Sequence, residues 1–155
     1  MATPLIVSEV AKAFTMHLRG GIRLPVVANV SFSVRAGECA VLGGPSGAGK
    51  SSILKMVYGN YGVDQGQIIV EHHGQLVDLA TANPRTVLSV RRDTIGYVSQ
   101  FLRTVPRVSA LDVVAEPLVA RGTSREDAHA RASELLGRLN LPERLWSLPP
   151  ATFSG

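Results

Sequence analysis

Residues 44–51 read Gly44-Pro45-Ser46-Gly47-Ala48-Gly49-Lys50-Ser51 and match the pattern G-x-x-x-x-G-K-[ST] at every fixed position. The stretch follows an apolar run at 39–42 and precedes a helical pattern at 52–58. Its glycines let the backbone curl so that several N–H groups point inward, and the helix N-terminus behind them adds positive potential. The pattern therefore predicts a phosphate-binding loop between a strand and a helix, and with it a nucleoside triphosphate site.

Each polar group of this loop has a predicted task. We expect Lys50 to reach the outer phosphates, Ser51 to offer its hydroxyl to Mg²⁺, and Ser52 to reach an inner phosphate oxygen. The alternative, a glycine-rich turn without a ligand, is disfavoured by the strand and helix patterns on either side. The residues predicted to contact the triphosphate are Gly44, Pro45, Ser46, Gly47, Ala48, Gly49, Lys50, Ser51 and Ser52.

Composition excludes several classes of protein. The chain has 155 residues, enough for one ordinary domain, and a formal net charge of +4. Its arginines are spread out, with one adjacent pair at Arg91-Arg92, so no basic block indicates nucleic-acid binding. The single cysteine, Cys39, rules out an intrachain disulfide and is expected to be a buried small hydrophobic residue. No secretory signal or membrane span is visible, which predicts a soluble cytoplasmic protein.

Periodicity divides the chain into a strand-rich part, 1–100, and a helical part, 101–155. Residues 26–34 alternate apolar and polar, which is typical of a half-buried antiparallel strand. Residues 39–42 and 95–98 read as buried strands. His72 and His73 are adjacent on a predicted strand, so we expect them to be surface histidines that face opposite sides and cannot easily share a metal.

The helical part shows two amphipathic patterns. The first starts after Ser109, a predicted N-cap, and Pro117 is expected to kink or end that helix because proline lacks the N–H its turn needs. The second starts after Ser124 and carries its apolar side chains on one face, predicted to be packed. That stripe consists of Ala128, Ala132, Leu135, Leu136 and Leu139.

Together, the loop, Gln100 about fifty residues later, the helical insertion and the terminal Phe153-Ser154-Gly155 resemble the ATP-binding-cassette (ABC) ATPase family. The runs at 96–103, 106–114 and 141–146 resemble one branch, the ATP-binding subunit of the bacterial phosphonate carbon–phosphorus lyase system. The resemblance implies an α/β fold, a P-loop NTPase of the ABC type. Such a fold has an N-terminal β-rich subdomain, a parallel-sheet core and a helical subdomain, here incomplete at the C-terminus.

The resemblance also implies roles for residues outside the loop. Phe14 would stack on the adenine of ATP, although an aromatic residue on a strand is equally typical of a hydrophobic core. Gln100 would contact Mg²⁺ and the attacking water, acting with Lys50 in catalysis. Ser154 and Gly155 would begin a signature motif that clamps the γ-phosphate bound to a second ABC ATPase protomer, in a homo- or heterodimer.

In the family, an acidic strand, a catalytic glutamate and a switch histidine lie beyond the signature motif. The chain is therefore expected to be a fragment that binds ATP and is inactive alone. The implied function is support of ATP-dependent phosphonate breakdown, with formation of a ribose 1-phosphonate triphosphate, together with soluble carbon–phosphorus lyase subunits. The alternatives are the ATPase motor of an exporter of the lipoprotein-release type and a nucleotide-dependent interaction module without turnover.

Overall fold

The computed structural model describes residues 3–16, 20–100 and 106–153. The chain divides into two compact units, residues 1–97 and residues 98–155, which are described separately below. The boundary predicted from the sequence, after residue 100, lies slightly further along the chain.

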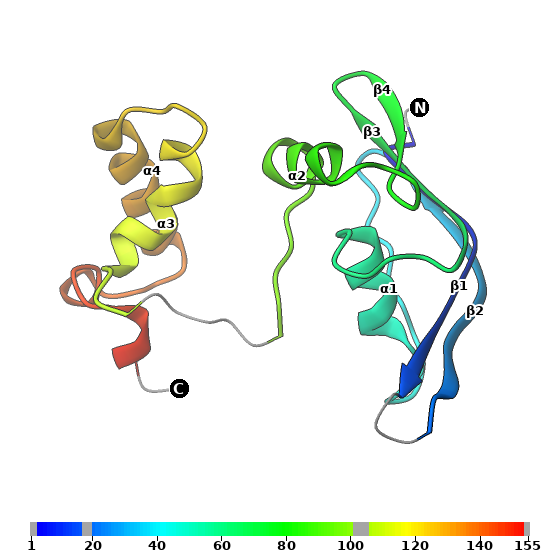
Figure 1. The fold of residues 1–155 in the computed structure, drawn as a ribbon. Helices are drawn as coiled ribbons and strands as arrows, with labels where there is room; N and C mark the ends of the chain where they lie inside the picture. Colours follow the sequence, from blue (N-terminus) through cyan, green and yellow to red (C-terminus); the bar gives the residue numbers. More distant parts are fainter. Residues whose placement is uncertain (1–2, 17–19, 101–105, 154–155) are drawn as a thin grey trace. The chain divides into compact units, whose positions relative to one another are not determined.

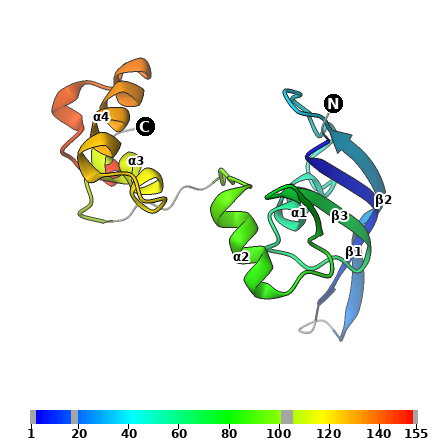
Figure 2. The same ribbon diagram turned by 90° about the horizontal axis from the view of Figure 1, so that it is seen from above.

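The first unit is built on a four-stranded antiparallel sheet with the strand order β2-β1-β3-β4 (Figures 1 and 2). The strands are β1 (Leu5–Met16), β2 (Ile22–Val34), β3 (Gln65–His72) and β4 (Gln75–Asp78). In β2, Val30, Phe32 and Val34 are half-buried whereas Ser31 and Ser33 are exposed. The half-buried antiparallel strand predicted for this segment is therefore confirmed.

The described part of this unit also contains the helices α1 (Lys50–Val57) and α2 (Pro84–Asp93). Helix α1 begins directly after the glycine loop, as its helical pattern predicts, and buries Ile53 and Met56. Helix α2 begins at an Asn83 N-cap, whose side-chain oxygen accepts a hydrogen bond from the Thr86 N–H at 2.9 Å.

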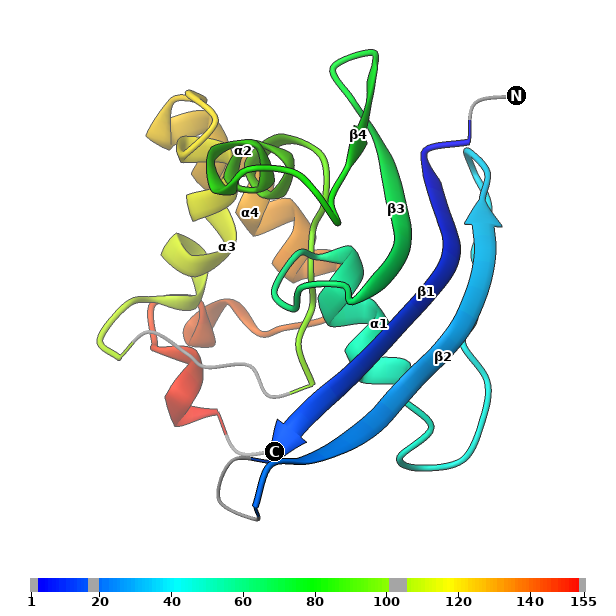
Figure 3. The ribbon, with the colours of Figure 1, turned by 45° about the vertical axis from the view of Figure 1, so that its right-hand side comes forward.

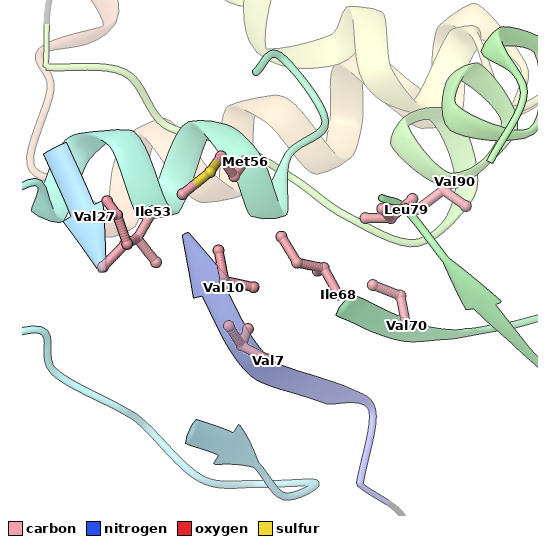
Figure 4. Close-up of a cluster of buried hydrophobic side chains, with 9 residues drawn as sticks. All are labelled: Val7, Val10, Val27, Ile53, Met56, Ile68, Val70, Leu79 and Val90. Atoms are coloured by element: carbon pink, nitrogen blue, oxygen red, sulfur yellow. The ribbon is translucent and has the colours of Figure 1, made fainter. Parts of the chain in front are cut away.

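One hydrophobic core joins these helices to the sheet (Figure 4). The sheet contributes valines and an isoleucine from β1, β2 and β3, the helices contribute Ile53, Met56 and Val90, and Leu79 follows β4. Since such apolar surface is worth about 25 cal/mol per Å² when it leaves water, this cluster is the main force that holds α1 on the sheet. Its buried members are Val7, Val10, Val27, Ile53, Met56, Ile68, Val70, Leu79 and Val90.

The two predicted buried strands at 39–42 and 95–98 do not form, which corrects the sequence analysis. Residues 39–42 and 95–98 have no strand assignment, and Val41 and Val98 are 86% and 85% exposed. Cys39 is also exposed rather than buried. A strand exists only when a neighbouring strand satisfies its N–H and C=O groups, and among the described residues no strand pairs with either segment.

The second unit contains α3 (Ala110–Val119), α4 (Arg125–Arg138) and the short 3₁₀ helices η2 (Glu143–Leu145) and η3 (Pro150–Thr152). Ser109 and Ser124 cap α3 and α4 as predicted, accepting hydrogen bonds from the N–H groups of Asp112 and Asp127. The helices pack through small side chains, Ala115 against Ala128 and Ala132. In the described ranges, no helix combines the length and apolar character needed to cross a membrane.

The predicted stripe on α4 is confirmed at its buried alanines and at Leu136, but Leu139 is 79% exposed. The helix ends at Arg138, so Leu139 is its C-cap and leaves the packed face.

At the start of α3, Asp112 accepts hydrogen bonds from Ser109, Arg125 and His129, and these partners lower the pKa of its carboxyl to about 2.

Gly66 occupies a position in β3 that no other residue fits. Its φ is +87°, and a Cβ there would lie 2.4 Å from the Ser8 carbonyl oxygen and 2.5 Å from the Glu9 carbonyl oxygen. The β1–β3 register shifts between Ser8 and Ala11, next to this contact. The close approach of two backbones at a β-bulge therefore requires glycine.

We expect Gly66→Ala to destabilise the protein by more than about 3 kcal/mol, since it adds a clash with backbone to a left-handed conformation. Gly74→Ala is the matched control, because Gly74 has a φ of +75° but nothing within 4 Å of its Cβ position. The control should lose only about 1–2 kcal/mol, the cost of the backbone conformation. Urea unfolding followed by circular dichroism measures both, and equal losses would contradict the steric account.

Candidate functional site

Gly49 fixes the phosphate loop against the sheet. It is the N-cap of α1 with a φ of +83°, and a Cβ there would lie 2.5 Å from the Val26 carbonyl oxygen and 3.0 Å from Val27 Cγ2. The loop backbone is thus in direct contact with β2, and the last glycine of the motif is required by this close approach.

The start of α1 presents unpaired backbone donors. No side chain caps the helix, and its first intrahelical hydrogen bond runs from the Ile53 N–H to the Gly49 carbonyl at 3.0 Å. The N–H groups of residues 50–52 precede that bond and point beyond the helix N-terminus, where they favour an anion. Figure 3 shows α1 packed along the strands β1 and β2, with this end next to the loop.

The Lys50 side chain folds back over the loop. Its ammonium group donates hydrogen bonds to the carbonyl oxygens of Gly44 at 2.8 Å and Pro45 at 2.7 Å. These carbonyls hold the cation at the mouth of the loop, and no carboxylate pairs with Lys50 among the described residues. The charge is therefore placed to meet an incoming phosphate.

A cavity of about 440 Å³ lies over the loop. Gly49 is buried, Lys50 and Ser52 are half-buried, and Ser51 is exposed, so its hydroxyl is accessible. The structure brings most of the predicted loop residues together at this cavity, and Gly44 and Pro45 hold the Lys50 ammonium. The cavity is lined by Val26, Ser46, Gly47, Ala48, Gly49, Lys50, Ser51 and Ser52.

These features fit a triphosphate and its Mg²⁺. The backbone donors and Lys50 suit phosphate oxygens, and the Ser51 hydroxyl is an oxygen ligand of the kind that Mg²⁺ prefers. The position that a Cβ would fill at Gly49 also shows that the loop is built for close backbone packing.

Phe14 lies near the end of β1 and is half-buried. Its ring contacts Tyr61 edge to face, with centroids 5.2 Å apart and an interplanar angle of 75°. The ammonium of Lys55, on α1, lies 5.1 Å from the centre of the Tyr61 ring. Phe14 is therefore connected to the helix that carries the phosphate loop.

Three charged residues beside Phe14 were not predicted from the sequence to belong to a site. Lys12 donates to Asp64 at 2.7 Å, Arg23 lies 3.5 Å from the same carboxylate, and the Ala13 N–H donates to it at 2.9 Å. The hydrogen bond from Lys12, with the backbone N–H and the charge of Arg23, lowers the pKa of the Asp64 carboxyl. With Phe14, they line a surface cavity of about 610 Å³.

The remaining predicted site residues belong to the second unit or lie outside the described residues. Gln100 is exposed and belongs to the second unit, so its role toward Mg²⁺ stays a prediction. Ser154 and Gly155, the predicted start of the signature motif, lie outside the described residues, as do Phe101, Leu102 and Arg103 from the resembling runs.

The chain is similar to known proteins in both sequence and structure. The profile of the family described as "ABC transporter" matches residues 27–155. The lipoprotein-releasing system ATP-binding protein LolD of Novosphingobium aromaticivorans is 35% identical over 158 residues, covering 100% of this chain and 66% of that protein. LolD 2 of Caulobacter vibrioides is 41% identical over 132 residues, covering 85% of this chain and 56% of its relative.

Two solved structures of MJ0796 share the fold. One, titled as the dimeric structure of a bacterial ABC transporter cassette, has a TM-score of 0.84, and the other, a post-hydrolysis dimer bound to ADP and Pi, has a TM-score of 0.82. Both are 27% identical to this chain and match 97% of it, which is 63% of their own length. They confirm the predicted fold class. The chain thus spans two thirds or less of the length of these relatives.

Lys50→Ala is expected to weaken ATP binding by roughly 2–4 kcal/mol, on the scale of removing one partner of a buried charge pair. The reason is that the Lys50 ammonium, at the mouth of the loop, is the cation nearest the expected phosphates. Isothermal titration calorimetry with Mg-ATP measures the change. Arg85→Ala, which removes an exposed positive charge from α2, is the control and should leave the affinity unchanged. If the Lys50 variant binds ATP as tightly as its parent, the assignment of a phosphate site to this loop is contradicted.

Phe14→Ala is expected to cost about 1–3 kcal/mol of ATP affinity, the range for base–aromatic stacking. Inorganic triphosphate, which has no base, should bind both proteins equally, and Phe14→Tyr should retain ATP affinity. Calorimetry and a thermal melt are measured on each variant. If Phe14→Ala unfolds the protein while Phe14→Tyr is silent, the residue belongs to the core and does not contact adenine.

Proposed function

The chain belongs to the ABC transporter family, and from that premise we propose that it forms the ATP-binding part of an ABC ATPase subunit. The observation that carries the proposal is the loop at 44–51, with Gly49 packed on Val26 and Lys50 held over the loop carbonyls. This arrangement offers a cation and backbone donors to one small volume, as a triphosphate needs.

Each residue of the site has a task in that proposal. The N–H groups of the loop and of the first turn of α1 bind phosphate oxygens, and Lys50 leaves its carbonyl partners to neutralise the outer phosphates. Ser51 would hold Mg²⁺, and the bound ion would supply positive charge near the phosphate oxygens. Phe14 would stack on the base, and the family resemblance assigns to Gln100 the task of orienting the attacking water.

For the system that the subunit serves, we favour a transporter motor of the lipoprotein-release type. The relatives with the highest identities quoted above are named as ATP-binding proteins of lipoprotein-releasing systems. The subunit would then work on the cytoplasmic face of a membrane permease, with a second ATPase protomer closing over the nucleotide. The two MJ0796 structures are described as dimers, which supports the pairing of two ATPase protomers.

The phosphonate carbon–phosphorus lyase system is the second candidate. It rests on the resemblance of residues 96–103, 106–114 and 141–146 to its ATP-binding subunit, whereas the relatives quoted above are named for lipoprotein release. In that system the partners are soluble lyase subunits, and ATP-driven closure of a dimer would supply conformational work.

Affinity purification from the native organism separates the two candidates. The tagged protein is purified from detergent-treated membranes and from the soluble fraction, in both cases in the presence of Mg-ATP. The Lys50→Ala variant is purified in the same way as the control. A permease that copurifies with the parent and is depleted for the variant supports the transporter motor. Copurification of soluble lyase subunits without a permease supports the phosphonate system. If neither the parent protein nor Lys50→Ala binds ATP, both candidate functions are overturned.

A further inference from the structure

His72, His73 and Asp93 meet at one end of the first unit, outside the phosphate site. One ring nitrogen of each histidine and one carboxylate oxygen of Asp93 all lie within 4.8 Å of one another. His72 ends β3, His73 is in the turn that follows, and Asp93 is the last residue of α2. Figure 3 shows the β3–β4 hairpin and α2 in this unit.

The turn brings the two histidines together, which corrects the expectation that they face opposite sides. β3 ends at His72 and β4 begins at Gln75, so His73 and Gly74 form a two-residue turn with φ values of +50° and +75°. In a strand, neighbouring side chains point to opposite faces, but this alternation does not hold in such a turn. The imidazole rings therefore lie with their centres 4.1 Å apart.

His72 is held in a defined orientation. It is only 9% exposed, which also corrects its assignment to the surface. Its Nδ1 lies 2.6 Å from Thr94 Oγ1 and its Nε2 lies 3.1 Å from Ser89 Oγ. If Nδ1–H donates to Thr94, the lone pair of Nε2 faces Ser89, whose hydroxyl is also 3.4 Å from Asp93 Oδ2. A hydrogen bond at the far nitrogen is the arrangement that fixes the tautomer of a metal-binding histidine.

Asp93 completes the group. Its Oδ2 lies 3.3 Å from His73 Nε2, and Arg92 donates to Oδ1 at 2.8 Å and to Oδ2 at 3.0 Å. The guanidinium orients the carboxylate and competes for its charge, but each carboxylate oxygen has a second lone pair. Two imidazoles and one carboxylate are a donor set suited to Zn²⁺ and related ions, whereas Mg²⁺ and Ca²⁺ prefer oxygen alone.

We propose that His72, His73 and Asp93 form a binding site for a divalent transition-metal ion of the zinc type. Zinc ligands lie about 2.0–2.2 Å from the ion, so the three donor atoms close inward by small side-chain rotations when the metal enters. The Ser89 hydroxyl or a water fills the fourth position. The metal then ties the β3–β4 turn to the end of α2, two elements that are otherwise joined here by hydrogen bonds to His72 and His73.

Zn²⁺ binding to the untagged full chain, measured by calorimetry, tests the site. We expect one Zn²⁺ per chain, and at least about tenfold weaker binding for His73→Ala, which removes a ligand, and for Asp93→Asn, which replaces the charged carboxylate with a neutral amide. His73 is exposed in a turn, so its removal spares the core. His129→Ala is the matched control, because His129 also contacts a carboxylate, Asp112 at 2.9 Å, without a second histidine.

Co²⁺ provides a second readout that does not depend on affinity alone. Its visible absorption should appear with the parent chain and with His129→Ala, and should be lost with His73→Ala. Thr94→Val, which keeps all three ligands but removes the partner of His72 Nδ1, should weaken Zn²⁺ binding by about 10- to 100-fold. Circular dichroism confirms that each variant is folded. Equal Zn²⁺ affinity in the parent, His73→Ala and Asp93→Asn, or loss of binding only in His129→Ala, overturns the proposal.

Discussion

The contact between Gly49 and the Val26 carbonyl determines where the phosphate loop sits. A side chain at residue 49 would enter β2, so the loop approaches the sheet only because the residue is glycine. That approach sets the axis of α1, whose Ile53 and Met56 then reach Val7, Val10 and Ile68 in the core. The same contact thus joins the ligand-binding end of the helix to the packing that stabilises the sheet.

Local sequence information was sufficient where a pattern is repeated within one element. The alternation at 30–34 predicted the exposed and half-buried faces of β2, and the spacing of Ala128, Ala132 and Leu136 predicted the packed face of α4. The loop residues were predicted because their motif combines a backbone requirement with a charge. In each of these cases the residues that determine the local structure lie within about ten residues of one another in the sequence.

The predictions that were wrong depended on partners elsewhere in the chain. Residues 39–42 are apolar enough for a buried strand, but a strand also needs hydrogen-bond partners, and no described strand supplies them. His72 and His73 were placed on opposite faces because strand alternation was extended one residue too far. The positive φ of His73 is the physical reason for that error, since non-glycine residues rarely adopt it and sequence gives it little weight.

The surroundings of Phe14 show the same limit and add a link between the two ends of the candidate nucleotide site. Lys12, Arg23 and Asp64 come from three segments, and only the β1–β2 pairing and the turn before β3 bring them together. Tyr61 contacts both Phe14 and the Lys55 ammonium. Lys50 and Lys55 are on α1 whereas Phe14 is on β1, so the two ends of the site lie on elements that the core packs together. The packing of α1 on the sheet therefore sets the distance between the phosphate end and the predicted base-binding end.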